Sequence, residues 1–136
     1  MTIDDIQDQI IEEMAVLDDW MDKYEYLIRL GRKLNSRDQE LRTERYAMQG
    51  CQASVWIKAE MMDKKIHFLA DSDSLITKGM LTLLLRVLND QTPEEIANAD
   101  LYFLPRTGLS TNLSPTRANG LALIVKHMKR YASTCS

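Results

Sequence analysis

The residue in this sequence best suited to covalent chemistry is Cys51. The chain has two cysteines, and the other, Cys135, is its penultimate residue. Gly50 precedes Cys51, and because glycine adopts positive φ without strain, it predicts a sharp turn that presents the thiol at the end of a sheet. One accessible thiolate is enough to attack the outer sulfur of a persulfide, hold it and release it to another thiol. The alternative is a structural cysteine packed as a small apolar side chain, which is the commoner role.

Other chemistry at Cys51 has less support in the sequence. A zinc or Fe–S site normally needs three or four ligands, and only His67, His127 and the remote Cys135 accompany Cys51. We expect His67 on the polar side of a strand and His127 on the surface, so no metal site is predicted. A cysteine–histidine hydrolase needs a group that orients its histidine, and the sequence assigns none, which leaves this as a weak alternative.

Arg117 is the candidate for activating the thiol. A thiolate is favoured by a nearby cation, yet no lysine or arginine lies between Arg45 and Lys58. Arg117 occupies the third position of a helix that Ser114 is expected to cap, where the helix dipole disfavours a cation. A residue that opposes local preference suggests a functional role, although Arg117 could equally reach solvent or pair with an acid such as Asp73.

Length and composition are those of one globular domain. The chain has 136 residues, of which 45% are hydrophobic and 27% charged. No apolar run reaches the roughly 20 residues that span a bilayer, and residues 1–5 include two aspartates and no basic residue. Two cysteines do not make a disulfide framework, which suits a reducing compartment. We therefore expect a single domain over residues 1–136, in the cytoplasm and without a membrane partner.

The charge of the chain argues against nucleic acid as a partner. The formal net charge is −3 at pH 7 and the isoelectric point is about 5.4, whereas nucleic-acid-binding domains concentrate lysine and arginine. The most basic stretch, residues 126–130, is expected at the end of a helix, where cations suit the dipole.

Apolar spacing predicts helices that frame a short sheet. Steps of three and four residues predict helices over 3–17, capped by Thr2, and over 20–31, capped within Asp18-Asp19 and ended at Gly31. The polar residues 35–45 are expected to form a loop. Further helices are expected over 75–88, after several N-cap candidates in Asp71-Ser72-Asp73-Ser74, and over 93–97, after a capping box at Thr92. The helix over 75–88 is expected to be the central core helix, and a last helix is expected from Pro115 onward, with a loop over 98–112.

Between these helices the apolar period changes to two. Alternation over Val55–Met61 and Ile66–Ala70, separated by Asp63-Lys64, predicts a β-hairpin, with Trp56 as an apolar exception on the polar face. Residues 46–49 are expected to add a third strand.

Several ordered groups of residues resemble the signatures of the SufE family. The likeness extends from residue 20 nearly to the end of the chain. Its motifs are Trp20-Met21-Asp22-Lys23-Tyr24, Gly50-Cys51-Gln52 with Val55-Trp56, Asp71-Ser72-Asp73 with Lys78-Gly79, and Leu113-Ser114-Pro115-Thr116-Arg117 with Gly120-Leu121.

The resemblance implies a fold and a function. The fold would be α+β, with a small antiparallel three-stranded sheet packed on helices as in related iron–sulfur scaffold proteins. Cys51 would accept persulfide sulfur from a SufS-like cysteine desulfurase, stimulate that enzyme, and pass the sulfur to a SufBCD-like cluster-assembly complex. The protein would be a sulfur carrier rather than an enzyme. It would have no cofactor of its own, because pyridoxal phosphate belongs to the desulfurase.

The resemblance also places supporting residues around the acceptor. Gly50 and Gln52 are neighbours of the thiol, and Asp73 and Arg117 match positions near the acceptor loop. Asn112 stands where relatives frequently have histidine, so the sequence shows no imidazole for proton transfer there.

Three alternatives to this function stay open at the level of sequence. A paralogous acceptor would share these motifs but deliver sulfur to another pathway. A non-catalytic adaptor would bind and stimulate the desulfurase without using Cys51. A thiol redox protein would need a resolving cysteine, for which only Cys135 is present.

Overall fold

The computed structural model describes residues 1–34, 41–48 and 54–134, and within these it has six helices and one two-stranded sheet. The expected α+β class is therefore confirmed. In chain order the elements are α1 (Ile3–Ala15), α2 (Trp20–Lys33), β1 (Val55–Met62), β2 (Lys65–Ser72), α3 (Leu75–Leu88), α4 (Pro93–Ala97), α5 (Phe103–Arg106) and α6 (Pro115–Thr134).

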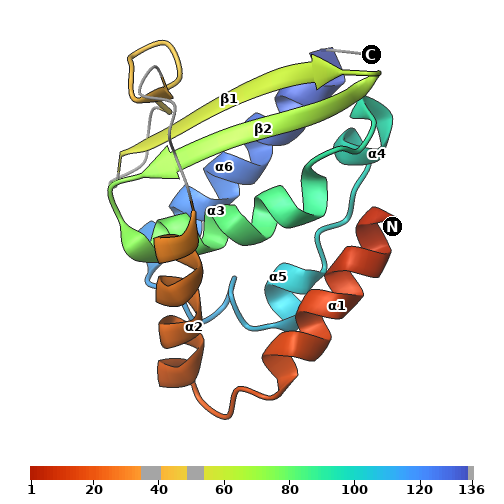
Figure 1. The fold of residues 1–136 in the computed structure, drawn as a ribbon. Helices are drawn as coiled ribbons and strands as arrows, with labels where there is room; N and C mark the ends of the chain where they lie inside the picture. The colour runs from red at the N-terminus through yellow and green to blue at the C-terminus, as the bar shows by residue number, and fades with distance from the viewer. Residues whose placement is uncertain (35–40, 49–53, 135–136) are drawn as a thin grey trace.

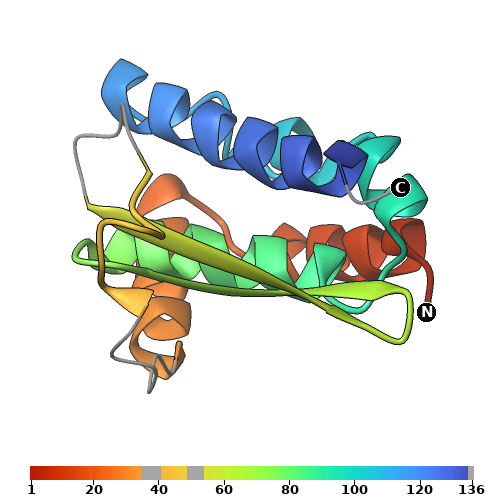
Figure 2. The same ribbon diagram turned by 90° about the horizontal axis from the view of Figure 1, so that it is seen from above.

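Helix α3 is the centre of the packing, as its apolar sequence predicts. Figure 1 shows the β1–β2 hairpin lying over α3, with α2 against one end of that helix and α6 running behind the sheet. Figure 2 shows α6 as a separate row alongside α3. Leu81, Leu84, Val87 and Leu88 of α3 have no exposed surface. No helix among the described residues is both long and apolar enough to cross a membrane.

The hairpin has the predicted strands and turn. Val55 pairs with Ser72 at one end of the ladder, and Met62 pairs with Lys65 at the other. Asp63 and Lys64 between them have φ values of 51° and 65°, the left-handed conformation of a two-residue type I′ turn whose twist matches that of the strands. The hairpin end opposite this turn is therefore where the chain enters β1 and leaves β2.

The expected third strand is wrong for the residues that the structure describes. Tyr46 accepts a hydrogen bond from the backbone N–H of Ile57 at 2.9 Å, and the N–H of Met48 donates to Val55 at 2.8 Å. Ala47 forms only an isolated bridge with Trp56. The segment is held against β1 by two hydrogen bonds, which is too short a ladder for a strand, and Gln49 lies outside the described residues.

Local capping signals are confirmed, but two helix ends are not, and the first helix ends at Ala15 rather than at residue 17. Thr2 and Thr92 form capping boxes, and Asp19 and Ser74 cap α2 and α3. Helix α2 does not stop at Gly31 but continues to Lys33. A Cβ on Gly31 would lie 2.3 Å from the carbonyl oxygen of Leu75, so this glycine permits close approach of two helices rather than a C-terminal cap.

The loop expected over residues 98–112 contains a short helix, α5. Phe103 is fully buried, and its backbone N–H donates to the side chain of Gln7 at 3.1 Å. Gln7 is itself fully buried on α1 and also donates to the carbonyl of Asp100 at 3.0 Å. This contact spans most of the chain, so local sequence carries no signal for α5.

Candidate functional site

The residues on either side of the Cys51 segment meet at the open end of the hairpin. Gly50, Cys51 and Gln52 lie outside the described residues. Before them, Met48 is hydrogen-bonded to Val55, as described above. After them, Ser54 directly precedes β1. The sheet therefore fixes both flanks of the predicted acceptor segment at the same edge.

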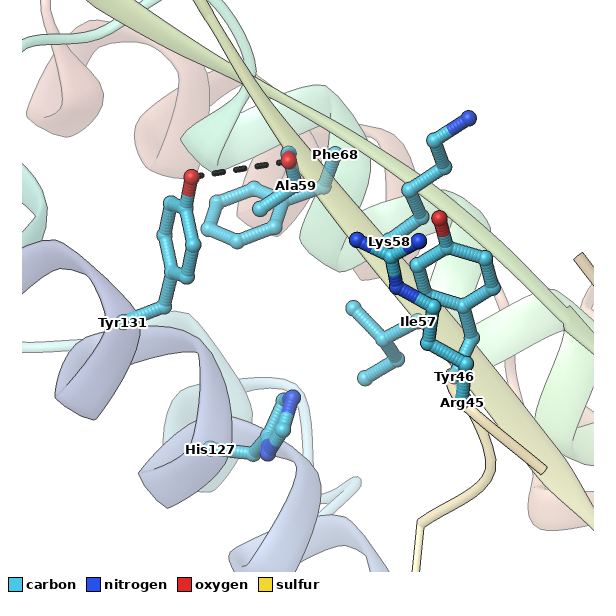
Figure 3. A pocket seen from close by; sticks show the side chains of 8 residues that line it. All are labelled: Arg45, Tyr46, Ile57, Lys58, Ala59, Phe68, His127 and Tyr131. Atoms are coloured by element: carbon cyan, nitrogen blue, oxygen red, sulfur yellow. Dashed lines mark hydrogen bonds between the residues drawn. The ribbon is translucent and has the colours of Figure 1, made fainter.

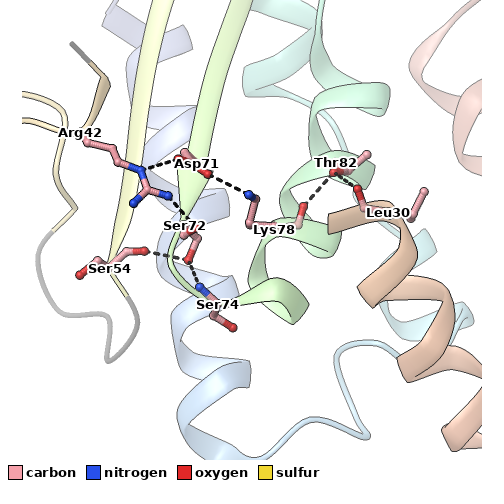
Figure 4. Close-up of polar contacts among 8 residues, drawn as sticks. All are labelled: Leu30, Arg42, Ser54, Asp71, Ser72, Ser74, Lys78 and Thr82. Atoms are coloured by element: carbon pink, nitrogen blue, oxygen red, sulfur yellow. Dashed lines mark hydrogen bonds and ion pairs between the residues drawn. The ribbon is translucent and has the colours of Figure 1, made fainter. Parts of the chain in front are cut away.

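Short polar contacts tie Ser54 to the turn between β2 and α3. The N–H of Ser54 donates to Oδ1 of Asp73 at 3.1 Å, and the N–H of Asp73 donates back to the Ser54 carbonyl at 3.3 Å. The buried hydroxyl of Ser72 donates to the same carbonyl at 2.7 Å and accepts from the N–H of Ser74 at 3.2 Å (Figure 4). Because Ser74 caps α3, the flank of the acceptor segment is coupled to the start of the central helix.

A buried carboxylate, Asp71, lies next to this network. It is 1% exposed, and its Oδ2 is 2.7 Å from Nε of Arg42 while its Oδ1 is 3.6 Å from Nζ of Lys78 (Figure 4). The Arg42 guanidinium also donates to the Ser72 carbonyl at 3.5 Å and lies 4.8 Å from the centroid of the Trp56 ring. Burial of a carboxylate costs free energy unless a nearby cation compensates its charge. Arg42 supplies such a cation, and its contacts with Asp71 and Ser72 of β2 hold the 41–48 segment against the sheet.

The sequence interpretation missed Arg42 because it lies in residues 35–45, which have no apolar periodicity. One signal pointed to it. Trp56 breaks the alternation of β1, and in the observed register it is opposite Asp71. An aromatic ring beside a buried acid offers a guanidinium both a flat surface and a counter-charge. The Trp56 exception is therefore explained by the arginine that covers it.

Arg117 lies in the first turn of α6, as predicted, with an exposed side chain. Its N–H donates to Oγ of Ser114 at 3.4 Å, which is the expected cap. In the part of the chain that the structure describes, no ion pair joins Arg117 to Asp73. Its action on the thiol stays a prediction.

Asn112 shapes the loop before α6. Its Nδ2 donates to the Gly108 carbonyl at 2.8 Å. Gly108 has φ of 83°, and a Cβ there would lie 2.6 Å from the Asn112 amide nitrogen. A second hydrogen bond to this turn comes from Nζ of Lys23, which donates to the Thr107 carbonyl at 2.9 Å. The amide therefore closes a turn.

The two histidines lie on different elements, β2 and α6. Nδ1 of His67, on β2, is 3.3 Å from a carboxylate oxygen of Asp90, and His127 is exposed on α6. Among the described residues, no group of three or more histidine, cysteine, aspartate or glutamate side chains is arranged to hold a metal ion.

Comparison with known proteins identifies the family. A family model described as "SufE: Fe-S metabolism associated domain" matches residues 8–132. The chain belongs to the SufE family. A SufE-like protein of Rhizobium meliloti, named as uncharacterised, is 34% identical over 130 residues, which cover 92% of this chain and 93% of the relative. A SufE-like protein of Synechocystis, also named as uncharacterised, is 36% identical over 124 residues, covering 91% and 78%.

Two further comparisons give a longer SufE-like relative and a solved structure of the same fold. The chloroplastic/mitochondrial SufE-like protein 1 of Arabidopsis thaliana is 35% identical over 111 residues, which cover 81% of this chain and 30% of that longer protein. The solution structure of a hypothetical protein from Thermus thermophilus matches with a TM-score of 0.76 over 95% of this chain and 94% of the other. At 18% identity this likeness shows the shared fold alone.

Outside the Cys51 segment, the residues that resemble SufE motifs make contacts that stabilise the fold. Lys78 contacts the buried Asp71, and Gly79 lets α3 approach α2. In the first motif, the rings of Trp20 and Tyr24 meet edge to face with centroids 5.0 Å apart. These contacts give Lys78, Gly79, Trp20 and Tyr24 structural roles in this fold.

Proposed function

We propose that this protein accepts persulfide sulfur on Cys51 from a pyridoxal-phosphate-dependent cysteine desulfurase in the cytoplasm. It would stimulate that enzyme by removing its product sulfur, and would pass the sulfur to an Fe–S cluster-assembly complex of the SufBCD type. The association of the SufE family with Fe–S metabolism is the observation that carries this proposal. The protein itself would need no cofactor, because the desulfurase supplies the chemistry that releases sulfur from cysteine.

The transfer step balances without an external oxidant or reductant. The Cys51 thiolate attacks the outer sulfur of the donor persulfide, forming a new S–S bond at Cys51. The S–S bond of the donor breaks, and the donor cysteine leaves as a thiolate that takes up a proton. A second exchange of the same kind delivers the sulfur to the next acceptor. One cysteine is therefore sufficient for the whole relay.

The flanks of the acceptor segment support this role. Three peptide units span at most about 11 Å, so covalent connectivity limits an acceptor at position 51 to the neighbourhood of Ser54 and Met48. Asp73 engages the Ser54 backbone there. We assign Asp73, Gly50 and Gln52 to shaping this segment, and Arg117 to favouring the thiolate by its positive charge.

Intact mass spectrometry tests the proposal directly. The protein is incubated with free cysteine and the desulfurase of the same organism, and we expect a gain of one sulfur atom that a reductant reverses. Cys51→Ser abolishes the gain, whereas Cys135→Ser, which removes the other cysteine, leaves it intact. A sulfur adduct that persists in Cys51→Ser refutes the acceptor role. Full stimulation of cysteine turnover by Cys51→Ser would show an adaptor instead.

A further inference from the structure

A cavity of about 380 Å³ lies between β1, the 41–48 segment and α6. Its floor is apolar and consists of Ile57 and Ala59 on β1 and Phe68 on β2. Tyr131 and His127 of α6 form the opposite wall (Figure 3). The phenol of Tyr131 donates to the Ala59 carbonyl at 3.5 Å. An apolar floor with a few polar groups at its edge is the usual composition of a binding pocket.

The rim of this pocket is positively charged. The Arg45 guanidinium lies over the Tyr46 ring at 5.4 Å from its centroid, and Figure 3 shows it at the mouth of the pocket. Lys58 also lies over Tyr46, at 5.5 Å, with its amine turned away from the cavity and 3.5 Å from Glu60. No carboxylate is among the described residues that line the pocket. The chain as a whole has a net charge of −3, so the charge at the pocket rim is opposite in sign to that of the whole protein.

The helix side of the pocket contributes a hydrogen-bonding group, the ring of His127. Partial burial of the ring, and secondarily the positive charge of Arg130, lower the pKa of His127 below the ordinary value near 6.5. His127 is therefore neutral at pH 7 and can donate one hydrogen bond into the pocket. The positive charge of Arg130, which contributes the smaller part of this shift, also favours an anion beside the ring.

The pocket shares a wall with the entrance to the acceptor segment. Tyr46 lines it and is hydrogen-bonded through its carbonyl to Ile57, which also lines it. Two residues later, Met48 is bonded to Val55 and the chain continues into the segment that contains Cys51. A group bound in the pocket therefore lies beside Arg45 and Tyr46, which belong to the chain segment that leads to Cys51.

We propose that this pocket docks an acidic segment of the cysteine desulfurase, with a carboxylate at the Arg45 and His127 rim and a neighbouring apolar or aromatic side chain on the Ile57, Ala59 and Phe68 floor. The inference rests on the proposed function, which supplies the partner. Charge complementarity supports an acidic occupant, and the position beside the segment that leads to Cys51 supports the sulfur donor over a free metabolite. Docking there keeps the desulfurase close to the Cys51 segment while sulfur is transferred.

Titration calorimetry of the full chain with the desulfurase tests the pocket. Arg45→Glu and His127→Glu place negative charge at the rim, and both positions are exposed, so the fold tolerates them. We expect each to weaken the Kd by about tenfold and to flatten its salt dependence. Lys65→Glu is the matched control. It makes the same charge change as Arg45→Glu on the exposed surface at the far end of β2, and we expect less than about a twofold effect from it.

The outcomes separate this inference from the proposed function. If Arg45→Glu and His127→Glu bind like Lys65→Glu while the wild type still gains sulfur at Cys51, the docking pocket is refuted and the acceptor role stands. If binding depends on Arg45 but the wild type gains no sulfur, the acceptor role fails and the pocket stands. Shifts of the His127 ring resonances with inorganic phosphate, together with unchanged desulfurase binding in both variants, would assign the pocket to a small anion and overturn the proposal.

Discussion

The crossing of α2 and α3 allows one substitution to be worked through quantitatively. A Cβ added to Gly79 would lie 2.1 Å from the carbonyl oxygen of Leu27 and 2.7 Å from its carbonyl carbon. Both are backbone atoms of α2, so no side-chain rotamer can relieve the overlap. Gly79→Ala must therefore push the two helices apart, by a distance on the order of 1 Å, in a core that is packed like a solid.

Two effects of opposite sign set the size of the change. Alanine favours the helical state over glycine by about 1 kcal/mol. Overpacking against rigid backbone costs about 3 kcal/mol or more, at the upper end of the usual range. We expect Gly79→Ala to lower the free energy of unfolding by about 2 kcal/mol, which for a domain of this length lowers the Tm by roughly 6 to 8 °C.

Urea denaturation followed by circular dichroism measures this change. Ala122→Gly, at an exposed position of α6, is the control that reports the helix-propensity difference alone, and we expect a loss of about 1 kcal/mol there. A neutral or stabilising Gly79→Ala would refute the reasoning, because it would mean that the two backbones are not in close contact. Since α3 begins at the turn that holds the acceptor flank, we also expect slower sulfur acceptance in this variant.

Three further outcomes follow from individual contacts. Arg42→Ala leaves the buried Asp71 with less compensation, and we expect a loss of about 1 to 2 kcal/mol in urea denaturation. Arg86→Gln removes the hydrogen bonds that lower the pKa of Glu13, and at neutral pH we expect a loss below about 1 kcal/mol, because both side chains are partly exposed. An NMR titration of the His127 ring is expected to give a pKa below the ordinary value near 6.5.

Each of these has an outcome that contradicts it. Arg42→Lys keeps the charge but not the planar group over Trp56, so stability equal to wild type would show that stacking is unimportant. A lowered folded-state pKa gives Glu13 a stabilising contribution that is lost as the pH falls through that pKa. The effect of Arg86→Gln must therefore vanish in acid, and a constant difference refutes the pair. A His127 pKa at or above 6.5 would contradict the combined effect of partial burial and the nearby Arg130 charge.

Features of the fold that depend on neighbouring residues were predictable from the sequence. Thr2, Asp19, Ser74 and Thr92 cap helices because each side chain satisfies a backbone donor within three residues of itself. The hairpin followed from its period of two and a polar turn. The family followed from ordered motifs, and the comparisons confirm it.

Features that depend on distant residues were not predictable in this way. Gly31 is typical of a helix end, and only the approach of α3 shows why it lies within α2. Helix α5 depends on Gln7, at the other end of the chain. The pairing of residues 46–48 with β1 consists of two backbone hydrogen bonds. The ion pair between Arg42 and Asp71 holds the same segment, and it joins residues 29 positions apart.

Sequence by itself determined the class of fold, the family and the one thiol on which the proposed function rests, because these follow from residue type and spacing along the chain. Tertiary structure alone decided which cations compensate Asp71, why Trp56 lies on a polar face, and that Arg45 and His127, 82 positions apart in the numbering, border one pocket. The physical reason is that burial and charge pairing are properties of positions in space, and local spacing does not encode them.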